Sequence, residues 1–326
     1  MIFFCQSVST DEPLTLHTLE FISGLRDAGL KIKAIIALRG DKNFYEGIPI
    51  YIVSGNKLTR LFKIYSLVLG KFKSEGKFFF YQNGFYVLIL SPLILFKYKF
   101  FQWISHPSPN YKSFISAFFL CKKIFTVNKM TFPFKLSNVF YVGLSINSIY
   151  LVNTIASNET RKFLKKYELF DNNYSLYIGR VARIKQIEEI ILVANQSYAL
   201  TGVKKLVIAG PSVTTKDKEY LHYLKNKIVP TLTQIEVIFL DEVTPIKAKE
   251  LFRQCAFSYC FSRTATDKTV YECLAVGRPV LCTNKAFSDS FNELKVPFLL
   301  AKDTVLAKEK IIEILKYWKS QNLLEL

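Results

Sequence analysis

The chain alternates short apolar runs with segments in which apolar residues recur at helical spacing. One such segment predicts a helix over residues 14–28, with apolar positions at Leu16, Leu19, Ile22 and Leu25. A second helix is predicted through residues 61–69. Continuous apolar runs predict buried β-strands at 2–5, 32–38, 49–53, 78–81, 101–104, 124–127 and 139–142.

The alternation restarts after a polar stretch, residues 147–159, and a short predicted helix at 161–166. Strands are predicted at 175–178, 206–209, 237–240, 257–260 and 279–282, and helices at 188–198, 245–254, 269–276 and 308–318. We therefore expect two domains, residues 1–153 and 154–326. Alternating β and α units predict parallel sheets covered by helices, with ligands bound at the carboxyl ends of the strands.

The longest apolar stretch, residues 85–96, contains Pro92 and spans about a dozen residues, whereas a membrane span needs about 20. It is therefore predicted to be a core helix. The apolar start of the chain, residues 1–6, lacks a basic region and a small-residue cleavage site, so no secretory signal is expected.

The net charge of +18 indicates an anionic partner: nucleic acid, anionic lipid or a phosphorylated substrate. Lysines alternate with aromatic residues in 96–101 and 112–123, which suits an anionic membrane surface and equally a solvated lysine-rich face. No helix-turn-helix, zinc-finger or RNP-like motif supports a nucleic-acid partner. The six cysteines form no Cys-x-x-Cys pair, so no zinc site is expected. Most of them lie in apolar runs, which predicts buried reduced thiols and, from these, a cytosolic compartment.

Two loops carry the candidate chemistry. In the first, Gly179 and Arg180 follow a predicted strand, and Lys185 precedes a predicted helix. Glycine admits close approach of a ligand, arginine and lysine bind phosphate oxygens, and a helix N-terminus favours anions. This combination fits a diphosphate, although a basic loop after a strand is also common.

The second loop leads from the strand at 257–260 into the helix at 269–276. Glu272 is expected on the first turn of that helix, where a carboxylate is favoured and can accept hydrogen bonds from a ribose diol. Thr269 is a candidate helix cap. The alternative is that Asp267 and Glu272 are only acids at a helix start.

The order of these pieces is more specific than any one of them. Strand-Gly-Arg-x4-Lys, strand-Ala-Gly and the segment TDKTVYECLAVGRPVLCTN follow one another along the second half. Over residues 174–300, and weakly in the first half, the chain resembles the GT4 family of retaining glycosyltransferases. The resemblance implies the GT-B fold, in which two Rossmann-like α/β domains have parallel sheets facing a central cleft.

The resemblance also implies roles for particular residues. Arg180 and Lys185 would hold the donor diphosphate and stabilise the leaving nucleoside diphosphate, and Glu272 would bind the ribose. His106, in the segment WISHPSPNYK, would approach the transferred sugar and complete the catalytic set. The donor-binding residues implied are Gly179, Arg180, Lys185, Gly210, Ser262, Thr264, Asp267, Lys268, Thr269 and Glu272.

The chain departs from the family pattern at several positions. Thr264 stands where the family has the first of two glutamates, so either Asp267 or Lys268 compensates or sugar recognition differs. Gln186 stands where a glycine usually follows the lysine, and residues 7–13 lack the usual glycines. The family continues with a further helix beyond the position of Leu326, which implies a C-terminal domain truncated at its end.

The function implied is transfer of a sugar from a UDP-, GDP- or ADP-sugar to a glycan or lipid-linked acceptor, in surface polysaccharide or glycolipid synthesis. Such an enzyme retains the anomeric configuration, needs no metal or other cofactor, and works in the cytoplasm or at the inner face of the membrane. The alternatives are a sugar-nucleotide epimerase or phosphorylase, a non-catalytic relative of the same fold, and a basic nucleic-acid-binding protein. The sequence alone does not indicate which nucleotide, which sugar or which acceptor is used.

Overall fold

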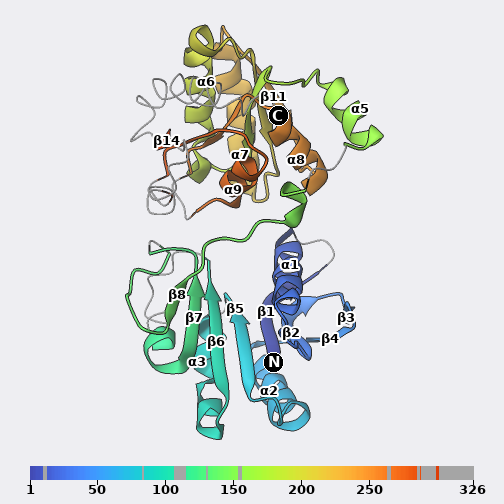
Figure 1. Ribbon diagram of the computed structural model, residues 1–326, viewed down its shortest axis with the longest axis vertical. Coiled ribbons are helices and arrows are strands. Elements are labelled where there is room, and N and C mark those ends of the chain that lie inside the picture. The colour runs from blue at the N-terminus through green and yellow to red at the C-terminus, as the bar shows by residue number, and fades with distance from the viewer. Residues whose placement is uncertain are drawn as a thin grey trace. The chain divides into compact units, whose positions relative to one another are not determined.

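The computed structural model describes residues 1–9, 13–82, 84–105, 115–129, 131–152, 156–262, 266–284, 287 and 299–300. The chain forms two compact units, Met1–Gly143 and Leu144–Leu326, and each is built on its own sheet (Figure 1). The predicted α/β class with two parallel-sheet domains is confirmed.

The first unit contains a sheet of strand order β3-β4-β2-β1-β5-β6-β7-β8. All neighbouring strands are parallel except the β3–β4 hairpin. The strands are β1 (Ile2–Val8), β2 (Ala34–Gly40), β3 (Phe44–Tyr45), β4 (Ile48–Ile52), β5 (Lys77–Tyr81), β6 (Lys99–Ile104), β7 (Cys121–Thr126) and β8 (Val139–Tyr141). Strands β1, β2 and β5 are mostly continuous apolar runs, because strands inside a parallel sheet are buried on both faces.

Helices of the first unit are α1 (Pro13–Asp27), α2 (Lys57–Ser66) and α3 (Gly84–Ile89). Three short helical turns accompany them, at Leu67–Lys71, Ser91–Phe96 and Ser116–Leu120. The single helix predicted over 85–96 is therefore wrong, since α3 stops before a separate 3-10 turn. Pro92 explains the break, because it has no N–H and its ring disfavours a continuing α-helix.

The sheet of the second unit has the order β11-β10-β9-β12-β13-β14, with every neighbouring pair parallel. Its strands are β9 (Tyr174–Ile178), β10 (Lys205–Ala209), β11 (Glu236–Leu240), β12 (Phe257–Cys260), β13 (Val280–Cys282) and β14 (Leu299–Leu300). This is the Rossmann order, in which the chain first builds outward from β9 in one direction and then in the other. The point of reversal lies between β9 and β12.

Helices of the second unit are α5 (Asn158–Lys166), α6 (Ile187–Thr201), α7 (Thr215–Tyr223), α8 (Pro245–Gln254) and α9 (Lys268–Ala275). Short turns occur at Ser148–Tyr150, Arg183–Lys185, Leu224–Ile228 and Val229–Thr231. The sequence did not predict α7, although Thr214 and Asp217 form a capping box at its start. The helix predicted over 308–318 lies outside the described residues.

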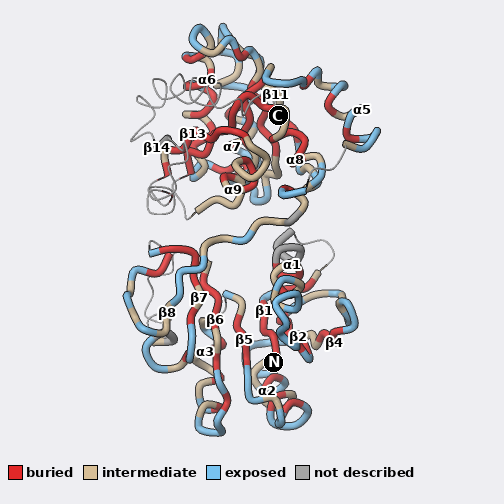
Figure 2. The backbone as a smooth tube through the Cα atoms, viewed as in Figure 1, coloured by how far each residue is buried: buried red, intermediate tan, exposed pale blue. Residues whose placement is uncertain are grey.

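Each unit has its own buried interior, and the strands are the most deeply buried segments (Figure 2). In the first unit Phe3 stacks on Phe79 with 5.5 Å between ring centroids, and Phe78 and Phe80 pack on the opposite face of the sheet. In the second unit, separate clusters cover the two faces of the sheet. All six cysteines are buried and free, as predicted.

Candidate functional site

The candidate site lies where two neighbouring strands of the second unit end. Strands β9 and β12 are adjacent, and Phe257 and Ser258 pair with Ser175 and Leu176. The segments that follow them lead to α6 and α9 respectively. Because ligands of open α/β sheets bind at the carboxyl ends of the strands where the strand order reverses, this is the expected ligand position.

Two glycines let the backbones of β9 and β10 approach closely at this edge. Gly179 has φ +152° and Gly210 has φ +142°, a region that residues with a side chain rarely adopt. A Cβ on Gly210 would lie 2.1 Å from the carbonyl oxygen of Gly179. The amide of Gly179 donates to the carbonyl of Ala209 at 2.9 Å, which fixes the approach. Both positions therefore require glycine for the edge to have this shape.

Lys185 connects the two loops. Its ammonium nitrogen lies 2.5 Å from the Asp267 carboxylate and donates a hydrogen bond to the Ser262 hydroxyl at 3.2 Å. Ser262 is buried, and the side chains of Lys185 and Asp267 are 15% and 22% exposed. The sequence predicted all three as site residues, and the fold brings them together across 82 positions of the chain.

Arg180 has a different neighbour, in the first turn of α7, the helix that follows β10. Its Nε lies 3.7 Å from the carboxylate of Asp217, and its side chain is about half exposed at 48%. Asp217 is nearly buried and also accepts a hydrogen bond from the amide of Thr214 at 3.0 Å. Asp217 was not predicted as part of the site, although the Thr-x-x-Asp pattern of its capping box was visible in the sequence.

Tyr177 lies between these charged groups and was also missed. Its hydroxyl donates to the carbonyl of Arg180 at 3.0 Å, which holds the turn after β9. Burial raises the pKa of this hydroxyl well above its usual range, the charge of Asp267 raises it further, and Arg180 opposes the shift. Both Asp267 and Arg180 therefore act electrostatically on the same buried group.

The thiol of Cys260 also faces Asp267. Its sulfur donates to Oδ2 of Asp267 at 3.5 Å. The pKa of Cys260 is raised well above its usual range by a hydrogen bond with Cys282, by burial and by the charge of Asp267, while Lys185 lowers it. The Asp267 carboxylate thus has Lys185 on one oxygen and a neutral thiol on the other.

The start of α9 differs in two details from the prediction. The helix begins at Lys268, so Thr269 is its second residue and does not cap it, and Glu272 falls on the second turn. Asp267 occupies the cap position, but its side chain makes no capping hydrogen bond. Glu272 is nearly buried, and Lys268 Nζ lies 3.8 Å from its Oε1. The helix dipole therefore acts less directly on Glu272 than expected, and Lys268 supplies a nearby positive charge.

The backbone at Gln186 adopts a conformation that favours glycine. It follows Lys185 with φ 53° and ψ 44°, the left-handed conformation that glycine adopts without strain. Its side-chain amide donates to Glu189 at 3.1 Å. Gln186 therefore adopts the backbone conformation that glycine would have at this position.

Two predicted site residues, His106 and Thr264, lie outside the described residues. Within the part of the chain that the structure describes, no three His, Cys, Asp or Glu side chains are grouped so that they could hold a metal ion. No helix in the same part is both long enough and apolar enough to cross a membrane.

The fold and the strand-end site define an α/β protein of the GT-B class. A family model, glycosyl transferases group 1, matches residues 159–324. The chain belongs to this glycosyltransferase family. No curated protein matches it in sequence.

Solved structures with the same fold cover nearly the whole chain. Anabaena HepE in complex with UDP-glucose is 11% identical, with a TM-score of 0.71 over 99% of this chain and 98% of that one. WaaG, a glycosyltransferase involved in lipopolysaccharide biosynthesis, is 11% identical, with a TM-score of 0.64 over 100% and 94%. The UDP-GlcNAc 2-epimerase of Methanocaldococcus jannaschii is 13% identical, with a TM-score of 0.60 over 97% and 93%. At these identities the likeness concerns the fold alone.

Proposed function

We propose that the loops after β9 and β12 bind the diphosphate of a nucleotide-sugar donor. The observation that carries this proposal is the convergence of Lys185, Ser262 and Asp267 at the reversal point of the sheet, beside the close backbone approach of Gly179 and Gly210. A lysine and a hydroxyl at a strand-end turn suit phosphate oxygens. The UDP and UDP-glucose complexes of HepE, which has the same fold, support this assignment.

The chemistry assigned to these residues is electrostatic. When the bond between the sugar and the diphosphate breaks, its electron pair stays on the departing diphosphate oxygen. The acceptor hydroxyl forms the new bond, and its proton passes to the departing diphosphate. Lys185 and Arg180 would stabilise the developing negative charge, and removal of one such contact slows a reaction by roughly 10²–10³-fold. Glu272 would accept hydrogen bonds from the ribose.

The finer assignment follows the GT4 pattern. We propose a retaining transfer that needs no metal, with His106 near the transferred sugar, and a glycan or lipid-linked acceptor in surface polysaccharide or glycolipid synthesis. The donor-binding set of the proposal adds Thr264, Asp267, Lys268 and Thr269. The reaction would take place in the cytoplasm, at the inner face of the membrane when the acceptor is a lipid.

The test is thermal unfolding with UDP, GDP and ADP, followed by nucleotide release from the matching sugar donors. A ligand at about 100 times its dissociation constant adds roughly 2.7 kcal/mol to the free energy of unfolding. We expect one nucleotide to stabilise the protein, with the shift lost in Lys185→Gln and reduced in Arg180→Ala. Lys165→Gln on α5, an exposed lysine of the same unit, is the matched control and should bind as the wild type does.

Three outcomes would change the proposal. No stabilisation by any of the three nucleotides, in a folded sample, would favour a non-catalytic relative or a nucleic-acid binder. Nucleotide binding with epimerised sugar and no acceptor-dependent transfer would favour an epimerase. Binding that is unaffected by Lys185→Gln would place the donor elsewhere.

A further inference from the structure

The positive charge of the chain is concentrated in one segment. Between Gly47 and Ser157 there are thirteen lysine and arginine residues and a single acidic residue, Glu75. Glu75 is itself engaged, since it lies 2.5 Å from Lys33 Nζ and 3.3 Å from the N-terminal amine. This stretch of the sequence therefore carries a net positive charge that its own acidic residues hardly reduce.

Part of this charge gathers at the edge of the first sheet where β5, β6 and β7 begin. Lys77 of β5 pairs in register with Lys99 of β6, and Lys123 of β7 pairs with Phe101. The Tyr98 hydroxyl donates to the Lys73 carbonyl at 3.4 Å, so the segments that lead into β5 and β6 lie side by side. Six lysines on this edge are exposed: Lys73, Lys77, Lys97, Lys99, Lys122 and Lys123.

Large apolar side chains are exposed on the helical turns that lead into the same strands. Leu95 and Phe96 precede β6 and are 85% and 67% exposed, and Phe119 precedes β7 and is 73% exposed. Leu69 and Phe118 are exposed as well. Figure 1 shows α2 and the connections into β5 and β6 at this end of the unit. We call the six lysines and these five apolar residues the amino-terminal edge surface.

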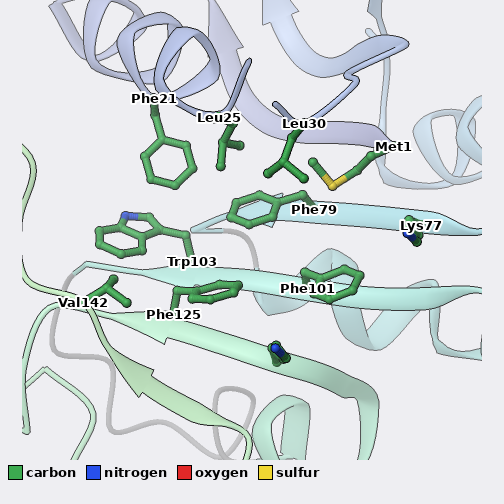
Figure 3. A pocket seen from close by; sticks show the side chains of 11 residues that line it. Met1, Phe21, Leu25, Leu30, Lys77, Phe79, Phe101, Trp103, Phe125 and Val142 are labelled. Atoms are coloured by element: carbon green, nitrogen blue, oxygen red, sulfur yellow. The ribbon is translucent and has the colours of Figure 1, made fainter. Parts of the chain in front are cut away.

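An apolar pocket of about 380 Å³ reaches the same edge (Figure 3). Phe79, Phe101, Trp103 and Phe125 project into it from the sheet, and Phe21 faces them from α1. Lys77 and Lys123 of the amino-terminal edge surface are its basic lining residues. Such a lining suits a hydrocarbon chain better than a nucleobase, whose polar edges would lose their hydrogen bonds there.

We propose that the first unit docks on an anionic lipid bilayer through the amino-terminal edge surface. Lysines attract anionic headgroups, and protruding leucine and phenylalanine side chains enter the boundary between headgroups and acyl chains. Nucleic acid shares the attraction to lysine, but an aliphatic side chain such as Leu95 offers no stacking face, and the lining of the adjoining pocket is mostly apolar. The inference extends the proposed function toward a lipid-linked acceptor, and it stands on different residues from the donor site.

The experiment is flotation of the full chain with vesicles of phosphatidylcholine alone or mixed with phosphatidylglycerol. We expect binding to the anionic vesicles, weakened by high salt, and little binding to the neutral ones. Two variants test the surface: Lys97→Gln with Lys99→Gln, and Phe96→Ser with Phe119→Ser. Each lysine near an anionic surface contributes about fivefold in partitioning, so the lysine pair should lower it by at least about tenfold. The phenylalanine pair should have a similar effect.

Matched controls come from α5, where Lys162 and Lys165 are exposed in the second unit. Lys162→Gln with Lys165→Gln removes the same charge and should leave vesicle binding within about twofold of the wild type. Wild-type binding by either edge variant, or equal binding to neutral and anionic vesicles, would overturn the inference. Absence of vesicle binding together with salt-sensitive binding of single-stranded DNA would assign the surface to nucleic acid. Nucleotide-induced thermal shifts, measured on each variant, separate this failure from failure of the donor site.

Discussion

The contact between Lys185 and Asp267 predicts that one mutation in the site will strengthen ligand binding, whereas mutations in a binding site usually weaken it. Asp267 places a carboxylate 2.5 Å from the ammonium that is proposed to bind the donor diphosphate. Asp267→Asn removes that negative charge while keeping the size and shape of the side chain. We expect the variant to bind a nucleoside diphosphate more tightly, because the ligand no longer shares Lys185 with a carboxylate.

The magnitude follows from the geometry. A phosphate oxygen at hydrogen-bond distance from Lys185 Nζ would lie about 4–5 Å from the Asp267 carboxylate, and two unit charges 4 Å apart interact by roughly 4 kcal/mol at an effective dielectric constant of about 20. Both side chains are partly exposed, at 15% and 22%, so solvent screening reduces the repulsion to about 1–2 kcal/mol. The dissociation constant for UDP, or for whichever nucleotide binds, should fall by roughly tenfold.

Isothermal titration with the free nucleotide measures this effect without any contact to the sugar. Asp241→Asn is the matched control, because Asp241 is an exposed acid directly after β11 at the same edge of the sheet. We expect Asp241→Asn to change the affinity by less than twofold and Lys185→Gln to weaken binding by about ten- to a hundredfold. Weaker nucleotide binding by Asp267→Asn would refute competition and would show that Asp267 holds Lys185 in the binding position.

Three further predictions concern backbone shape and charge. Gln186→Gly should be more stable than Gln186→Ala by about 1 kcal/mol in urea unfolding, because both lose the bond to Glu189 but only alanine is strained at φ 53°. At Glu189, an ordinary helical position, the alanine variant should instead be more stable than the glycine variant. Gly210→Ala should lower the free energy of unfolding by more than about 2 kcal/mol, since its Cβ would meet a carbonyl oxygen at 2.1 Å, and a wild-type melting temperature would contradict the close approach. The pKa of Glu75 is lowered chiefly by the hydrogen bond from Lys33, so this carboxylate stabilises the fold at neutral pH and the stabilisation is lost as pH falls through the lowered pKa. The melting temperature of Glu75→Gln should therefore lie below that of the wild type at neutral pH, and the two should converge in acid.

Strands and long helices of this chain could be predicted because their burial leaves a direct pattern in the sequence. The predicted bounds of α8 and β12 match the structure, and the other predicted strands differ at their ends by a few residues, whereas the two-residue strand β14 was not predicted. Helix α7 was missed because its sequence is mostly charged and polar and only Asp217 and Tyr220 are buried. The strand β3 is two residues long, too short to show any period.

The partners within the site could not be predicted from spacing alone. Lys185 and Asp267 are 82 positions apart and meet only because β12 lies next to β9 rather than next to β11. The pairing of Arg180 with Asp217 depends on where α7 begins, and that helix was not predicted. The sequence thus indicated which residues belong to the site, but predicting which of them contact one another would have required the strand order.

The pairing of Lys185 also bears on which ligands the site accepts. In the free protein its ammonium already has partners, among them Asp267 and Ser262, so a ligand gains only the difference between its own contacts and those it replaces. A nucleoside monophosphate brings a single phosphate group and should gain little. A diphosphate brings a second group that Arg180 can also reach if its 3.7 Å pair with the largely buried Asp217 opens toward the ligand. We therefore expect UDP to stabilise the wild-type protein far more than UMP in thermal melts, and Asp267→Asn to narrow that difference. Equal stabilisation by UMP and UDP would mean that neither cation selects the second phosphate.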